Sequence, residues 1–113
     1  MGMNSSYITA LPDDWERVAR VFSAMGDATR QRILLLFEPG ESISLSSLVA
    51  TVGLSRTAVS HHVNVLVRAG LLIPQRQGKE VLYRRDLPFA VEMLDRVRDY
   101  ALAELAAEQG ERS

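Results

Sequence analysis

The sequence predicts a mainly α-helical fold with one small β-hairpin. Four stretches before Gly70 have apolar residues at three- and four-residue spacing, each bounded by turn or capping residues. After Gly70 the pattern becomes that of two short strands around the turn Gln77-Gly78-Lys79. From Phe89 to Ala107 the spacing is helical again. We therefore expect one domain of about five helices and a two-stranded hairpin.

Acidic residues mark the starts of the first two helices. The first is expected to begin at Asp13-Asp14, whose charges suit the positive end of a helix dipole, and to end near Gly26. Asp27 is placed to cap the second helix, which we expect to reach Phe37. Its last five residues, 33–37, are all apolar, which predicts a helix buried on most sides.

The next two helices are joined by a tight turn. Apolar residues over 43–52 mark a third helix, with Ser44 or Ser46 as its cap, and Gly53 leads into a fourth helix capped by Ser55. Three short helices with a glycine-containing turn between the last two make the plan of a helix-turn-helix.

The fourth helix has one apolar and one polar face. Its apolar positions recur at helical spacing as far as Ala69, and Gly70 is placed to end it in a left-handed cap. The polar face carries short or polar side chains, most of which can donate to a base edge or a phosphate. They are Ser55, Arg56, Thr57, Ser60, His61 and Asn64. This pattern is typical of a recognition helix that enters a groove of DNA.

Basic residues are concentrated in one part of the chain. Residues 53–85 contain six basic residues and one acidic residue, although the net charge of the protein is −1. Lys79 lies at the tip of the hairpin, and Arg76 and Arg84 lie along its sides. A basic hairpin directly after a recognition helix predicts a wing along the phosphate backbone, and so a winged helix-turn-helix. The alternative is an ordinary charged surface hairpin.

The last helix carries a longer apolar stripe than one small core needs. It follows Asp86-Leu87-Pro88, a capping residue with a proline in the first turn. We predict that it pairs, together with the first helix, with a second copy of the chain to form a homodimer. The predicted interface residues are Trp15, Val18, Phe22, Val91, Leu94, Val97, Ala101 and Leu105. The alternative is that this helix packs only on its own chain.

Several classes of function are excluded or disfavoured. Cysteine is absent, which excludes disulfides and thiolate ligands, and the two histidines are adjacent with no acid near them in sequence. There is no glycine-rich phosphate loop, so we predict no enzyme. With no apolar run of membrane-spanning length and no leader, we expect no membrane association and a cytoplasmic, nucleoid-associated protein. The expected division is a flexible arm over 1–12, the domain over 13–107 and a flexible tail over 108–113.

The chain resembles the ArsR/SmtB family of bacterial winged-helix repressors. The segments that carry the resemblance are 27–37, 54–72 and 77–84, and the likeness extends roughly from Trp15 to Leu105. It implies a homodimer that binds an imperfect palindrome, its operator, on double-stranded DNA and is released by a metal or another small ligand. The family's groove-facing positions match Ser55, Arg56, Thr57, Ser60 and His61. At the position of Arg56 the family often has glutamine; an arginine prefers a guanine edge or a phosphate where glutamine suits adenine, so we expect a different operator sequence.

The sequence departs from the family at the positions that bind the signalling metal. Ser44 and Ser46 occupy the positions of the family's Cys-x-Cys metal ligands, and hydroxyls bind soft metals poorly. The second family site, between the last helices, lacks its histidines because none follows His62. His61 and His62 point about 100° apart, so they do not form a metal site, and we expect His62 to pack on the core side. We predict no metal and no cofactor.

Two functions remain open. The first is a dimeric DNA-binding repressor, regulated by an unidentified small-molecule effector or by its abundance alone. The second is a winged-helix interaction module that does not bind DNA. The basic stripe and the polar recognition face favour the first.

Overall fold

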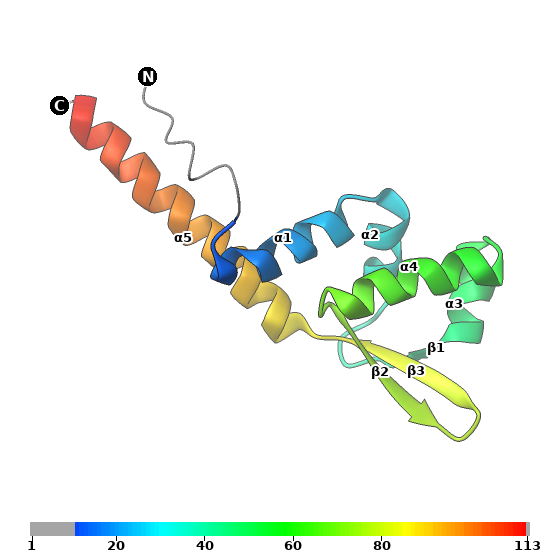
Figure 1. The fold of residues 1–113 in the computed structure, drawn as a ribbon. Helices are drawn as coiled ribbons and strands as arrows, with labels where there is room; N and C mark the ends of the chain where they lie inside the picture. Colours follow the sequence, from blue (N-terminus) through cyan, green and yellow to red (C-terminus); the bar gives the residue numbers. More distant parts are fainter. Residues whose placement is uncertain (1–10, 113) are drawn as a thin grey trace.

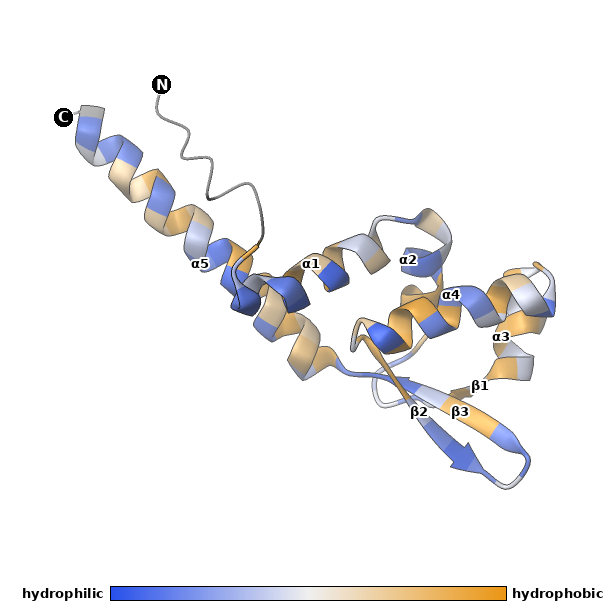
Figure 2. Ribbon diagram, in the orientation of Figure 1, coloured by the Kyte–Doolittle hydropathy of each residue, from blue (hydrophilic) through white to orange (hydrophobic). Residues whose placement is uncertain are grey.

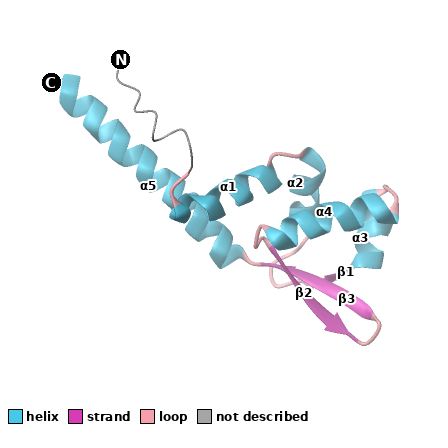
Figure 3. Cartoon of the chain, viewed as in Figure 1, coloured by secondary structure: helices cyan, strands magenta, loops and turns pink. Residues whose placement is uncertain are grey.

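The computed structural model describes residues 11–112, which form five helices and three strands (Figures 1 and 3). In chain order the elements are α1 (Asp13–Met25), α2 (Ala28–Leu35), β1 (Ile43–Ser44), α3 (Leu45–Val52), α4 (Arg56–Arg68), β2 (Leu72–Gln77), β3 (Glu80–Arg85) and α5 (Leu87–Arg112). The expected mainly α fold with a β-hairpin is confirmed. Residues 1–10 of the expected N-terminal arm lie outside the described residues.

The sheet has one strand more than the sequence predicted. The order is β1-β3-β2, all antiparallel, and Ile43 pairs with Tyr83 while Ser44 pairs with Leu82. Ile43 was expected in the third helix, and that expectation was wrong by two residues, because α3 begins at Leu45. A two-residue strand leaves no periodicity to detect, and its partner lies about 40 residues further along the chain.

Side-chain caps begin most of the helices where the sequence placed them. Asp27 accepts a hydrogen bond from the backbone N–H of Arg30, Ser44 from Ser47, and Ser55 from Ala58, each at 3.1 Å. Asp86 accepts one from Phe89, also at 3.1 Å. Because each cap satisfies a donor that the helix itself cannot, these residues fix where α2, α3, α4 and α5 start.

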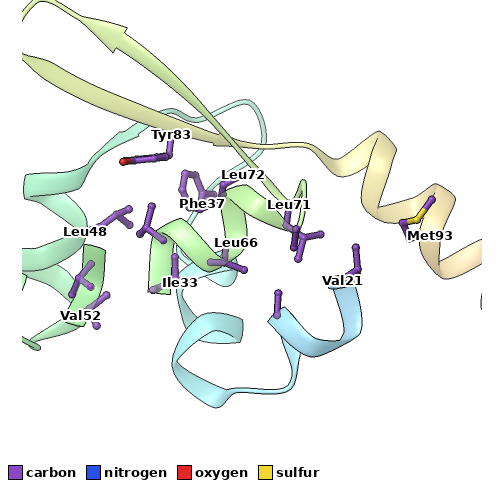
Figure 4. Packing of buried hydrophobic residues seen from close by; sticks show 14 of the residues in the cluster. Val21, Ile33, Phe37, Leu48, Val52, Leu66, Leu71, Leu72, Tyr83 and Met93 are labelled. Atoms are coloured by element: carbon purple, nitrogen blue, oxygen red, sulfur yellow. The ribbon is translucent and has the colours of Figure 1, made fainter. Parts of the chain in front are cut away.

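One core joins the helix-turn-helix to the sheet (Figure 4). Ile33 of α2, Leu48 of α3 and Leu66 of α4 are at most 1% exposed. The second helix is less buried than expected: it ends at Leu35, whose side chain is 80% exposed. Five consecutive apolar residues cover the whole circumference of a helix, and here only one side meets the core.

The last helix is longer than the sequence predicted. α5 has 26 residues, begins at Leu87 and continues to Arg112, whereas the apolar pattern predicted a helix over 89–107. Its first half packs on α1, where Met93 is fully buried and the rings of Trp15 and Tyr100 meet edge to face at 5.4 Å. Its second half extends away from the body (Figure 1), and residues 101–111 are all exposed.

Arg30 links three helices. From α2, its Nε donates to the carbonyl oxygen of Ala24 in α1 at 2.6 Å, and its Nη1 lies 3.2 Å from Nδ1 of His62 in α4. A guanidinium can only donate, so His62 accepts through Nδ1 and carries its proton on Nε2. His62 therefore has the structural position that the sequence predicted, on the inner side of α4.

The Asp27 cap makes stability depend on pH. The pKa of its carboxyl is lowered from its ordinary value of 3.8, first by the hydrogen bond from the Arg30 backbone N–H and further by the charge of the Arg30 guanidinium. A lowered pKa in the folded state gives stability that is present above pH 3.8 and is lost as the pH falls through the folded value. We expect Asp27→Asn, which keeps the cap, to be less stable than wild type at neutral pH and to converge with it in acid. If the difference between the urea-unfolding midpoints of wild type and Asp27→Asn stays the same from pH 6 down to pH 3, this expectation is contradicted.

Candidate nucleic-acid interface

The polar face of α4 is open to solvent along its length. Five of the six predicted contact residues are exposed and one, Ser60, is half-buried. The exposed residues are Ser55, Arg56, Thr57, His61 and Asn64. The opposite face is fixed in the core, since Val59, Val63 and Leu66 are fully buried. The orientation of the polar face is therefore set by packing and needs no DNA to define it.

Hydrogen bonds fix both ends of α4, one through a side-chain cap and the other through the backbone. Ser55 accepts from the Ala58 N–H, which leaves its own hydroxyl proton free to donate. At the other end Gly70, at φ +87°, donates to the Val67 carbonyl at 3.0 Å, and Leu71 donates to the Leu66 carbonyl at 3.0 Å. This pair of bonds is a Schellman motif, which turns the chain from α4 directly into the wing.

The wing presents its basic residues to solvent. Arg76 on β2, Arg84 on β3 and Lys79 at the turn are all exposed. Figure 2 shows the outer part of β2 as strongly hydrophilic. Arg85 differs from them: it is half-buried, donates to the Leu34 carbonyl at 3.3 Å and lies over the Phe37 ring at 6.0 Å. Arg85 therefore anchors the base of the wing to α2.

The tip of the wing and the start of α4 come together. A hollow of about 100 Å³ is lined by Arg56 from α4, Lys79 from the wing, and Ser44 and Ser46 from the start of α3. Glu80 also lines it, so the hollow is not uniformly basic. Two cations and a hydroxyl-bearing helix start on one surface suit contacts to a phosphate backbone beside a groove.

The two serines at the family's thiolate positions have ordinary roles. Ser44 caps α3 and donates to the Ser47 hydroxyl at 3.0 Å, and Ser46 is exposed. Within residues 11–112 no three histidine, cysteine, aspartate or glutamate side chains are grouped so that they could hold a metal ion. Over the same residues, no helix is both long enough and apolar enough to cross a membrane.

Two basic residues near this surface were not among the contact residues predicted from the sequence. Arg20 of α1 and Arg68 of α4 line a hollow of about 300 Å³ together with His61. Arg68 was included in the basic charge of the segment, but Arg20 belongs to a helix that was assigned only to dimerisation. Helical spacing could have placed Arg68 beside His61, seven residues apart; only the packing of α1 on α4 brings Arg20 there.

The predicted dimer residues divide into buried and exposed groups. Val18 is 3% exposed within its own chain, because its side chain fills the core between α1 and its neighbours, so it offers little surface to a partner. Trp15 and Val97 are half-buried. The remaining predicted residues are exposed, namely Phe22, Val91, Leu94, Ala101 and Leu105.

A helix-turn-helix with its polar helix face open and a basic wing beside it is the architecture of a DNA-binding transcriptional regulator. Comparison with known proteins agrees. A family model described as a helix-turn-helix domain matches residues 25–75. The probable mercury resistance operon repressor of Streptomyces lividans is 32% identical over 92 residues, which cover 81% of this chain and 73% of the relative.

Solved structures have the same fold. An ArsR-like transcriptional regulator from Rhodococcus sp. RHA1 is 31% identical, with a TM-score of 0.68 over 85% of this chain and 92% of that one. The homodimeric winged helix-turn-helix domain Mb0332 of Mycobacterium bovis is 24% identical, with a TM-score of 0.60 over 89% and 91%. The chain belongs to the ArsR family of winged helix-turn-helix transcriptional regulators. These relatives are described as a probable operon repressor and a transcriptional regulator, which is the class of protein that the sequence predicted.

Proposed function

We propose that the protein is a homodimeric repressor that binds a palindromic operator. The observation that carries this proposal is the open polar face of α4 next to the basic wing. The proposed base-reading residues are Arg56, Thr57, Ser60, His61 and Asn64, while Ser55, Arg76, Lys79 and Arg84 hold phosphates. The protein would act in the cytoplasm, on the nucleoid. Its relative in Streptomyces lividans is described as a probable repressor, which supports repression rather than activation of transcription.

A second copy of the chain is the proposed partner of α5. Val91, Leu94, Leu102 and Leu105 are each about half exposed, at spacings that place them on one face of a helix. The buried Met93 lies on a different face, which already packs on α1. An apolar stripe along a projecting helix is the kind of surface that an isologous dimer covers. The Mycobacterium bovis domain of the same fold is described as a homodimer.

The proposed signal is not a metal at the family's usual sites. Ser44 and Ser46 replace the thiolates, and the described residues hold no cluster of metal-binding side chains. We propose either an unidentified small-molecule effector or control by abundance alone. Thermal-shift screening with metals and metabolites would distinguish an effector from control by abundance, because a ligand that binds the folded, DNA-free protein must raise its stability. Each compound found would then be tested for release of the protein from its operator.

Two substitutions test the groove assignment. Arg56→Ala should relax the preference for particular operator bases by about 1–3 kcal/mol at one position, because a base-reading arginine is lost. Lys79→Ala should instead weaken binding about equally for all sequences and lower the salt dependence of log K by about 0.9, because it removes one phosphate contact. Gel shifts on the promoter fragment and on scrambled DNA, at two salt concentrations, measure both. If neither substitution changes binding, the groove assignment is wrong.

A further inference from the structure

The surface between α1 and the C-terminal half of α4 has a basic hollow that shares only His61 with the proposed groove contacts. Its volume is about 300 Å³. It is lined by Arg20, Ser23, Ala24, His61, Val65, Arg68 and Ala69. Two arginines therefore line it, and none of the described residues that line it is acidic. Two arginines without an opposing carboxylate attract an anion.

The polar side chains at this hollow are available to a ligand. Arg20, His61 and Arg68 are all exposed. Arg68 donates a hydrogen bond through Nε to the Asn64 carbonyl oxygen at 3.4 Å. The two terminal nitrogens of its guanidinium remain able to donate to a ligand. The floor is different in character, because Ala24 and Ala69 are buried and apolar. The hollow thus combines an apolar floor with a cationic and hydroxyl-bearing rim.

The position of the hollow connects it to the recognition face. On α4, His61 and Arg68 are seven residues apart, so they lie on the same side of the helix, about two turns from each other. Lys79, a proposed phosphate contact, lies beside Arg56 at the opposite end of the same helix. Cations at both ends of a groove-reading helix match the two phosphate backbones that border a major groove.

We propose that this hollow binds a phosphodiester of the operator backbone. Arg20 and Arg68 hold the phosphate, the Ser23 hydroxyl donates to it, and the adjoining deoxyribose packs on the floor of Ala24, Val65 and Ala69. α1 would then contact DNA as well as support the dimer. This inference rests on the proposed function, because it requires α4 to lie in the groove.

The test compares single-arginine variants on the same operator. Arg20→Ala should bind about tenfold more weakly at about 50 mM salt and about threefold more weakly at about 200 mM, because loss of one phosphate contact lowers the salt slope by about 0.9. Arg17→Ala is the matched control: it lies one turn earlier on α1 and faces the Phe89 ring at 5.9 Å rather than the hollow. It carries the same change in net charge and should bind within about twofold of wild type, since uncontacted surface charge has only a screened effect.

Single methylphosphonate substitutions in the operator locate the contact. One neutralised phosphate should weaken wild type but not Arg20→Ala, whereas other contacted phosphates should weaken both proteins equally. If every methylphosphonate has the same relative effect on both proteins, or if Arg17→Ala loses as much affinity as Arg20→Ala, the phosphate site is overturned. If inorganic phosphate at constant ionic strength saturates the hollow in DNA-free protein and does not do so in Arg20→Ala, the hollow is a free-anion site and the assignment to DNA is overturned. Failure of wild type to bind DNA at all would instead overturn the proposed function.

Discussion

Replacing Gly70 by alanine is expected to lower the free energy of unfolding by about 3 kcal/mol, the sum of a left-handed backbone and an overpacked contact. Gly70 has φ +87°, and a Cβ there would lie 2.8 Å from Cε2 of Phe89. Phe89 has little freedom to move aside, because it follows the Asp86 cap at the start of α5. The residue therefore holds the junction at which α4, the wing and α5 meet. Urea unfolding followed by circular dichroism measures the loss.

Two comparisons separate the backbone term from the contact. Gly78 at the wing turn also has a positive φ, +64°, but a Cβ there would have nothing within 4 Å. Gly78→Ala should therefore cost only about 1 kcal/mol, the backbone term alone. Replacing Phe89 by leucine should cost less stability in the Gly70→Ala background than in wild type, because the smaller side chain relieves the clash. Equal losses for Gly70→Ala and Gly78→Ala would show that the Phe89 contact contributes nothing.

Local sequence signals predicted the helix starts and the recognition face well. Asp27 and Ser55 each cap a helix by binding a backbone N–H three residues later. Because this interaction is local in sequence, residue type and spacing are enough to predict it. The burial of Val59 and Val63 follows from a 3.6-residue period that the sequence displays directly. Whether these side chains touch DNA stays a prediction.

Features that depend on distant parts of the chain could not be predicted in this way. β1 exists only because β3 offers an edge, and Leu35 is exposed because no other element within residues 11–112 covers that side of α2. Val18 has the same spacing as the exposed residues of α1, and only the tertiary structure shows that it is buried. The hollow at Arg20 likewise depends on α1 packing against α4, which helical periodicity does not encode.

Placing a charge on the exposed apolar stripe of α5 is expected to dissociate the dimer and weaken operator binding by about 100-fold or more, because two linked half-site contacts become independent. Leu105→Glu is the sharpest choice. Leu105 is 48% exposed in a part of α5 where residues 101–111 are all exposed, so the monomer should fold normally. Sedimentation equilibrium should give a monomer, and the unfolding midpoint of the dilute protein should change little.

A glutamate on the other side of the same helix serves as the control. Ala103 is exposed and lies two residues, about 200° of helix rotation, from Leu105. Ala103→Glu adds the same charge to the same turn and should leave both the dimer and the operator affinity unchanged. A Leu105→Glu protein that sediments as a dimer would place the self-association surface elsewhere. A Leu105→Glu monomer with wild-type operator affinity would show instead that one recognition helix is sufficient, since the stripe would then pair the subunits without contributing to DNA binding.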